Sequence, residues 1–177
     1  MNYAQVFGCD TANGVGCRTS LFVSGCTHHC KECFNPETWD FGYGKEFTIE
    51  VQNKLIELTD KPYINGFTIL GGEPMEVVNQ AALRPFIERV NKELPDKTIW
   101  IYSGYTWEEL TDPSNKCCHS NDTDRILAGI DVLVDGEFHI DEKDISLRFR
   151  GSSNQRVIDV PATLESGSIV LSQYGDK

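Results

Sequence analysis

The sequence predicts an α/β protein with a mostly parallel sheet that closes only part of the way into a barrel. Two observations lead to this class. Short apolar runs rich in β-branched and aromatic residues alternate with segments whose apolar residues recur at helical spacing. Each of the best-defined runs also ends in a short glycine-containing motif. Alternating strands and helices form right-handed βα units, whose strands lie parallel.

The first expected elements follow a turn signal near the N-terminus. Asn13-Gly14 is typical of a hairpin turn, and residues 19–25 (TSLFVSG) then form an apolar, β-branched strand. A helix is expected over residues 48–59, with Thr48 as its N-cap. Residues 66–70 (GFTIL) form the second strand of the predicted sheet.

The second half of the chain continues the alternation. Apolar residues from Leu83 to Leu94 recur every three or four positions, which predicts a helix with Pro85 in its first turn. The remaining elements, in chain order, are strand 98–102 (TIWIY), a short helix opened by a capping box of Thr106 and Glu109, a polar loop over 111–124, a helix near 124–128, and strands 130–134 and 156–160.

Four motifs come directly after the ends of expected strands. They are GCTHHCKECFN (25–35), GGEP (71–74), SGY (103–105) and DG (135–136). Because the carboxyl ends of parallel strands face one common edge of a βα barrel, we expect these motifs to meet in space.

Length and composition indicate one globular domain. With 177 residues, 40% of them hydrophobic, the chain can bury a sizeable core. It has no apolar run of membrane-spanning length and no secretory signal at its N-terminus, so we expect a cytoplasmic protein in a reducing compartment. The formal net charge of −11 disfavours nucleic acid as a partner, because phosphate backbones repel an acidic surface.

The seven cysteines favour metal binding or catalysis over a disulfide framework. Their number is odd, and a reducing compartment keeps thiols free. We expect Cys9 and Cys17 to be buried thiols, and Cys117-Cys118 to be free. Cys26, Cys30 and Cys33, in contrast, fall within eight residues and indicate a metal site.

The three clustered thiols lack a fourth partner. Structural zinc takes four ligands, but His28 and His29 stand so close to the cysteines in sequence that either would strain a tetrahedron. We therefore expect both histidines to be solvent-facing loop residues. Electron-transfer ferredoxins supply four cysteines to each cubane. Three cysteines leave an open coordination position, which a catalytic metal needs.

The motifs taken together resemble a known enzyme family. C-x3-C-x2-C after the first strand, followed by GGEP after the second, is similar to the radical S-adenosylmethionine enzymes. NGVGCR, LFVSGC, CFNPETW, SGY, LVDGEF and RGSSNQ narrow the resemblance to the glycyl radical activases that serve anaerobic ribonucleoside-triphosphate reductase. The resemblance implies a radical S-adenosylmethionine domain over residues 1–160, with the partial barrel of that family. Residues 161–177 remain as a C-terminal extension of unknown role, in which 169–174 (IVLSQY) could add a strand.

The resemblance also implies an activity. Cys26, Cys30 and Cys33 would hold one 4Fe-4S cluster, whose fourth iron binds S-adenosyl-L-methionine. Reductive cleavage to a 5′-deoxyadenosyl radical would then generate a glycyl radical on the large subunit of anaerobic ribonucleotide reductase. Reduced flavodoxin or ferredoxin is the implied electron donor, and no catalytic residue beyond the cluster ligands is implied. Two alternatives stay open: a small radical enzyme acting on a small molecule, similar to 7-deazapurine synthases, and a zinc-binding interaction module.

Further residues are expected around the cluster by the same resemblance. Gly72, which has no Cβ, would contact the methionyl group, with Gly71 and Glu73 beside it. Glu32, Cys33 and Phe34 are expected near adenosine, with Phe34 replacing the aromatic residue that many relatives carry before the last cysteine. Additional candidates are Ser103, Tyr105 and Asp135 for the cofactor pocket, and Arg150, Ser152, Asn154 and Gln155 for cofactor or partner contact. Trp39 is expected only to pack.

Overall fold

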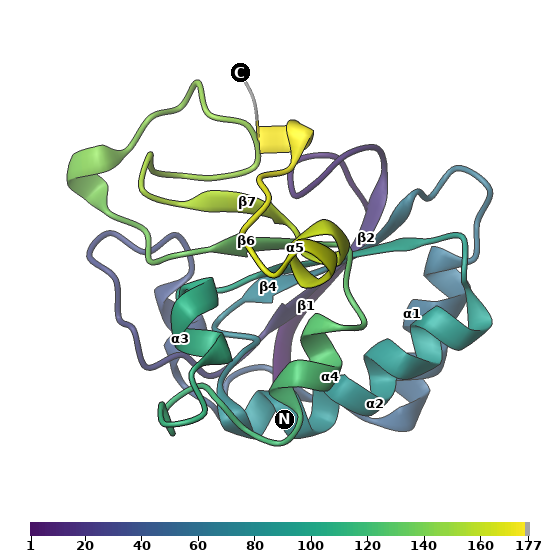
Figure 1. Ribbon diagram of the computed structural model, residues 1–177. Coiled ribbons are helices and arrows are strands. Elements are labelled where there is room, and N and C mark those ends of the chain that lie inside the picture. The colour runs from purple at the N-terminus through teal and green to yellow at the C-terminus, as the bar shows by residue number, and fades with distance from the viewer. Residues whose placement is uncertain (176–177) are drawn as a thin grey trace.

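The computed structural model describes residues 1–175 and is built on one seven-stranded sheet with the order β3-β1-β2-β4-β5-β6-β7 (Figure 1). The strands are β1 (Asn2–Asp10), β2 (Arg18–Val23), β3 (Lys45–Glu46), β4 (Gly66–Gly71), β5 (Thr98–Tyr102), β6 (Val132–Asp135) and β7 (Arg156–Asp159). The α-helices are α1 (Ile49–Thr59), α2 (Val77–Glu93), α3 (Trp107–Thr111), α4 (Thr123–Leu127) and α5 (Val160–Ser166). Short 3-10 helices cover Pro36–Trp39, Ile140–Glu142 and Gln173–Gly175.

The predicted α/β class with an open, mostly parallel sheet is confirmed. β2, β4, β5 and β6 are parallel neighbours, and their order along the sheet follows their order in the chain. The flanking strands β1, β3 and β7 run antiparallel to their neighbours. β1 was not expected, because its residues are half-exposed and lack an apolar run; it is stabilised by pairing with β2 across the predicted Asn13-Gly14 hairpin. The barrel type of the radical S-adenosylmethionine enzymes remains a prediction.

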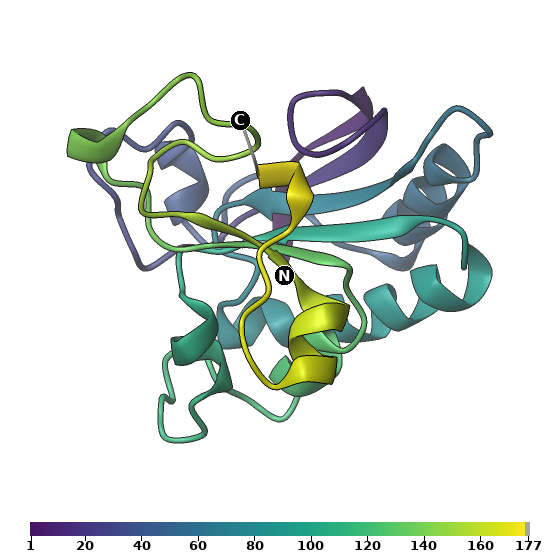
Figure 2. The same cartoon turned by 45° about the horizontal axis from the view of Figure 1, so that its top comes forward.

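The two faces of the sheet are covered differently. Side chains alternate along each strand, so Ile99 and Ile101 of β5 join the larger core, together with residues of α1, α2, α4 and α5. Trp100 points to the opposite face and forms a smaller cluster, against which Tyr102 and Phe149 pack. Two views of the ribbon show helices α1, α2 and α4 on one side of the sheet and the loops of residues 136–155 on the other side (Figure 2). The face without long helices is the one with room for a ligand.

Helix α2 begins at Val77, eight residues before Pro85. We expected Pro85 in its first turn, but Pro85 lies inside the helix. A proline here removes one backbone hydrogen bond, and buried polar side chains hold the turns before it. Asn79 donates to the carbonyls of Ser24 and Glu73, and Gln80 donates to the carbonyl of Met75. The capping box of Thr106 and Glu109, in contrast, is confirmed at the start of α3.

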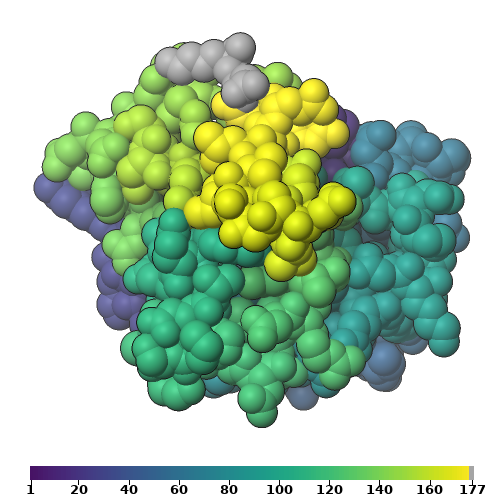
Figure 3. All heavy atoms as spheres, viewed as in Figure 1, coloured from purple at the N-terminus to yellow at the C-terminus, as the bar shows by residue number. Residues whose placement is uncertain are grey.

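The C-terminal segment packs on the body of the protein and forms a helix that was not predicted. α5 buries Val160 and Thr163, and Asp159 caps it by accepting a hydrogen bond from the Ala162 amide. Residues 169–174 do not form the added strand considered above: Leu171 makes a single bridge to Ile158. In the space-filling view this segment, in yellow, lies across the middle of one face of the molecule (Figure 3).

Two of the cysteine expectations are wrong. Cys9 and Cys17 form a disulfide rather than buried thiols, because the β1–β2 hairpin brings their Cα atoms to 5.4 Å, and Cys9 is exposed. Cys117 and Cys118 are free, as expected. None of the helices in the described part of the chain combines the length and apolar character needed to cross a membrane.

Candidate active site

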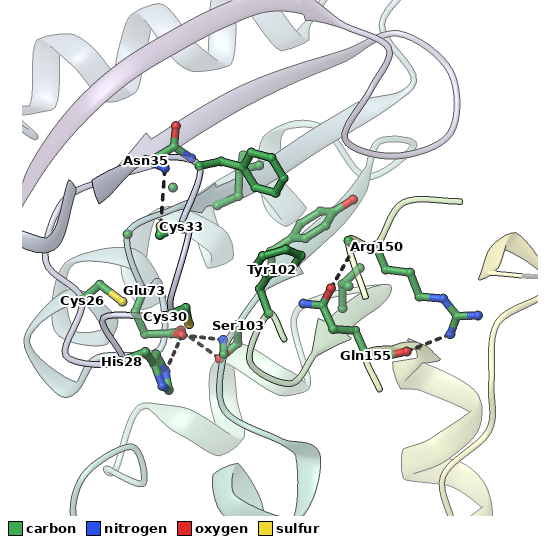
Figure 4. Close-up of a pocket in the computed structure, with 18 of the residues that line it drawn as sticks. Cys26, His28, Cys30, Cys33, Asn35, Glu73, Tyr102, Ser103, Arg150 and Gln155 are labelled. Carbon is green, nitrogen blue, oxygen red and sulfur yellow. Dashed lines mark hydrogen bonds and ion pairs between the residues drawn. The ribbon is translucent and has the colours of Figure 1, made fainter. Parts of the chain in front are cut away.

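A cavity of about 580 Å³ lies on the sheet face without long helices, at the carboxyl ends of the parallel strands. Its size falls in the range of small-molecule sites. All four motifs that follow strand ends contribute to its wall, which confirms that they converge (Figure 4). The motif residues in the lining are Cys26, His28, Cys30, Cys33, Phe34, Asn35, Gly71, Gly72, Glu73, Ser103, Gly104 and Gly136.

The cysteine loop is fastened to the segment that follows it. The amides of Gly25 and Cys26 donate to the carbonyls of Thr38 and Trp39 in the 3-10 helix, at 2.8 and 3.2 Å. On the other side, the amide and hydroxyl of Thr27 both donate to the buried carboxylate of Glu76. These bonds anchor the start of the loop, and all three thiols line one cavity.

Two of the three thiols, those of Cys26 and Cys30, are protonated without a metal. Burial raises the pKa of Cys26 to about 12, and burial also raises the pKa of Cys30. Thiols bind metals as thiolates, so loading this loop must release protons. Within residues 1–175, no three Cys, His, Asp or Glu side chains are gathered around one point as they would be around a single metal ion.

Glu73 of GGEP is the most highly connected side chain in the cavity wall. Its carboxylate is 1% exposed and accepts four hydrogen bonds: from the Met75 and Gly104 amides, the Ser103 hydroxyl and the His28 imidazole. Four donors occupy the lone-pair positions of the two oxygens. Glu73 therefore fixes the geometry of the strand ends, and Gly71 and Gly72 beside it present only backbone to the cavity.

His28 does not face solvent, contrary to expectation. Its side chain is 8% exposed; Nε2 lies 3.0 Å from Glu73 and Nδ1 lies 2.6 Å from Glu137. Burial alone would lower its pKa, but the hydrogen bonds and charges of the two carboxylates outweigh that effect and raise the pKa to about 9. The ring also packs on Tyr105, with centroids 4.3 Å apart. His29 is exposed, as expected, and stacks on Trp39.

Of the two residues that flank Cys33, Phe34 lines the cavity and Glu32 does not. Phe34 lines the cavity but is 69% exposed, and its ring lies 5.4 Å from Phe138. Glu32 is exposed, has a positive φ of 58° and is not among the lining residues. Its carboxylate is therefore turned to solvent while its backbone shapes the loop.

The later strand ends contribute unequally. Ser103 lines the cavity through its bond to Glu73. Asp135 is not part of the cavity lining: its carboxylate accepts from Arg156 and from the Trp107 amide, and it borders a second hollow of about 400 Å³.

Only some of the candidate residues in the RGSSNQ segment line the cavity. Arg150 and Gln155 line the cavity, and Arg150 donates to the Gln155 carbonyl at 2.8 Å. Ser152 is buried and accepts from the His139 amide, whereas Asn154 donates to the Glu137 carbonyl and borders the second hollow. In Figure 4, Arg150 and Gln155 lie on the opposite side of Tyr102 from the cysteines.

Two cavity residues were missed as binding candidates. The Tyr102 hydroxyl and the Trp39 indole nitrogen are buried and have no hydrogen-bond partner among the described residues. Burial raises the pKa of Tyr102, so its hydroxyl stays protonated and can donate. The position of Tyr102, one residue before the SGY motif on the strand face opposite the helices, is a signal that sequence reasoning could have used.

Comparison with known proteins identifies the family of this chain. Residues 12–158 match the family model described as a 4Fe-4S single cluster domain. The anaerobic ribonucleoside-triphosphate reductase-activating protein of Vibrio cholerae serotype O1 is 42% identical over 157 residues, which cover 88% of this chain and 96% of the relative. Proteins of the same name are 38% identical in Escherichia coli K12 and 35% identical in Enterobacteria phage T4, each over 89% of this chain and at least 93% of the relative. The chain therefore belongs to the family of anaerobic ribonucleoside-triphosphate reductase-activating proteins.

Proposed function

We propose that this protein is an iron–sulfur activase that cleaves S-adenosyl-L-methionine and generates a glycyl radical on the large subunit of an anaerobic ribonucleoside-triphosphate reductase. One observation carries the proposal furthest: Cys26, Cys30 and Cys33 share a single cavity with the GGEP backbone. Membership of the activating-protein family supplies the target enzyme.

The donor set and the cavity fit a 4Fe-4S cluster with a small organic cofactor. Three thiols are the ligands that iron–sulfur clusters take, and each thiolate of a cubane binds a different iron, so the three need not surround one point. The unpartnered Tyr102 hydroxyl and Trp39 indole nitrogen are polar groups to which a bound molecule can offer a partner. A cluster with three cysteine ligands, loaded with S-adenosyl-L-methionine and reduced, supplies a 5′-deoxyadenosyl radical.

The chain's own residues bind and orient the cofactor in this proposal. Cys26, Cys30 and Cys33 hold the cluster as thiolates. Gly72 allows a charged amino acid group to approach its backbone closely, since no side chain intervenes. Glu73, whose carboxylate is already saturated, keeps that backbone in place. Tyr102 donates a hydrogen bond from its hydroxyl to an acceptor on the cofactor.

The floor of the cavity excludes water. Phe22, Leu70 and Val134 line it from the parallel strands β2, β4 and β6, and Phe149 lines it as well. An apolar wall keeps water away from a reactive radical, so that the radical reacts with its target. Phe34, which is exposed and at the same time lines the cavity, is placed to contact either adenosine or an incoming segment of the reductase.

Two further parts of the proposal rest on the family. The electron donor is a reduced flavodoxin or ferredoxin, and the reaction runs without oxygen. The protein works in the cytoplasm, where the reductase makes deoxyribonucleotides.

Anaerobic reconstitution tests the proposal. The protein loaded with iron and sulfide and reduced with dithionite should contain about four iron atoms per chain. It should convert S-adenosyl-L-methionine to equal amounts of methionine and 5′-deoxyadenosine. Colourless protein that carries one zinc ion and forms neither product would contradict it.

A further inference from the structure

His28 belongs to one of the four segments that form the cavity edge and contacts the other three. It belongs to the cysteine loop, between Cys26 and Cys30. Its Nε2 bonds to Glu73 at the end of β4, its Nδ1 bonds to Glu137 after β6, and its ring packs on Tyr105 after β5. The labelled residues of Figure 4 show His28 beside Glu73, with Ser103 on the other side of that carboxylate.

The fold makes room for this side chain. A Cβ on Gly104 would lie 2.7 Å from Cδ2 and Nε2 of the imidazole, so any side chain there would displace the ring. Gly104 has no positive φ, so the need for glycine at this position comes from clearance. The Gly104 amide donates to the same Glu73 oxygen that His28 contacts.

The imidazole of His28 connects the cysteine loop to two carboxylates, Glu73 and Glu137. Each ring nitrogen faces one carboxylate: Nε2 lies 3.0 Å from Glu73, and Nδ1 lies 2.6 Å from Glu137. Of the four donors to Glu73, two are backbone amides and one is a hydroxyl; His28 is the one that comes from the cysteine loop.

We propose that His28 is a positioning residue for S-adenosyl-L-methionine: it holds the Glu73 carboxylate, and with it the GGEP backbone, against the cysteine loop. The inference rests on the proposed function, since it concerns how that cofactor is held. Thr27 keeps its separate bonds to Glu76 when His28 is replaced, so the cysteine loop stays anchored. Loss of His28 therefore weakens cofactor binding and leaves the cluster in place.

Amide substitutions separate the two bonds of the imidazole. A glutamine amide nitrogen occupies about the position of Nε2, and an asparagine nitrogen occupies about that of Nδ1. His28→Gln thus keeps the donor to Glu73, and His28→Asn keeps the donor to Glu137. His28→Ala removes both. The matched control is His139→Ala, since His139 is an exposed histidine that pairs with Glu142 and does not line the cavity.

The test measures three quantities on the anaerobically reconstituted, full-length protein: iron per chain, the dissociation constant for S-adenosyl-L-methionine by equilibrium dialysis, and the change that S-adenosyl-L-methionine causes in the electron paramagnetic resonance spectrum of the reduced cluster. His28→Ala and His28→Asn should keep wild-type iron and bind about tenfold or more weakly. Their spectra should respond only at correspondingly higher concentrations. His28→Gln and His139→Ala should bind within about threefold of wild type.

Several results would overturn the inference. His28→Ala with wild-type affinity would do so, as would loss of iron in parallel with loss of affinity, because His28 would then build the cluster loop. Equal weakening in His28→Gln and His28→Asn would show that Glu73 is not the partner that matters, and it decides the question even if the alanine variant fails to fold. Wild-type protein that takes up iron but does not bind S-adenosyl-L-methionine would refute the proposed function instead.

Discussion

The Ser103 hydroxyl donates a hydrogen bond to the Glu73 carboxylate, with 2.8 Å between Oγ and Oε1, and this buried bond joins the ends of β4 and β5. The same hydroxyl accepts a hydrogen bond from the Tyr105 amide at 3.1 Å. One small side chain therefore completes the carboxylate's set of donors and shapes the turn after β5. The wall of the cavity depends on such side-chain bonds between strand ends, where backbone pairing has stopped.

Replacement of Ser103 by alanine should destabilise the protein. It removes one of four donors to a buried carboxylate, and the loss of a hydrogen-bond partner by a buried acceptor costs about 1–3 kcal/mol. Urea unfolding of the full-length chain measures the change. The control is Ser114→Ala, whose hydroxyl donates to Asp112 on an exposed loop and whose loss should change stability by less than about 0.5 kcal/mol. Equal effects in the two variants would refute the role given to the Ser103–Glu73 bond.

Alanine at Cys26, Cys30 or Cys33 should each reduce bound iron and abolish cleavage of S-adenosyl-L-methionine. The reason is that each thiolate holds a separate iron of the cluster. Iron analysis and chromatography of 5′-deoxyadenosine measure the two effects. Cys117→Ala, at an exposed free thiol, should leave both at wild-type levels. Full cleavage by Cys30→Ala would rule out that residue as a ligand.

Gly71→Ala should destabilise the fold more than an ordinary glycine substitution at positive φ. Gly71 has φ +109°, and a Cβ there would lie 2.8 Å from the backbone of Phe22 and Val23 on the neighbouring strand. We expect a loss of about 2–4 kcal/mol in unfolding experiments. Gly167→Ala separates the two causes, because Gly167 has φ +69° with nothing near its Cβ position; it should cost about 1 kcal/mol. A smaller loss for Gly71 than for Gly167 would contradict the steric argument.

Tyr102→Phe should have opposite effects on stability and on binding. The buried hydroxyl lacks a protein partner among the described residues, so its removal should leave the cofactor-free protein equally or more stable. S-adenosyl-L-methionine should bind about two- to tenfold more weakly, since one hydrogen bond is lost. Thermal unfolding and equilibrium dialysis provide the two values. Tyr63→Phe, at an exposed position outside the cavity, is the control. Unchanged affinity in Tyr102→Phe would remove Tyr102 from the binding site.

The central βα units and the meeting of the motifs could be predicted from the sequence. Runs such as GFTIL and TIWIY are buried parallel strands whose composition identifies them without tertiary context. Once their direction is known, the topology requires that the cysteines, GGEP and SGY lie at one edge. The capping box at Thr106 is similarly local, which explains why it was found to the residue.

The features that were missed depend on partners distant in the chain. His28 looks like a solvated loop residue until Glu73 and Glu137, far along the sequence, are placed beside it. Asp135 stands at the end of a strand, as a cofactor ligand would, yet Arg156 of the antiparallel neighbour β7 pairs with it. Helix α2 passes through Pro85 because Asn79 and Gln80 bond to loops that the local pattern does not reveal.

The central claim is that this protein generates a glycyl radical on an anaerobic ribonucleotide reductase. The most direct measurement is electron paramagnetic resonance of the reconstituted, reduced protein mixed without oxygen with S-adenosyl-L-methionine and the reductase's large subunit. A doublet from a glycyl radical should appear, and it should be absent when Cys30→Ala replaces the wild-type chain. If S-adenosyl-L-methionine is cleaved but no doublet forms on the reductase, the claim is wrong, and a small-molecule substrate becomes the better account.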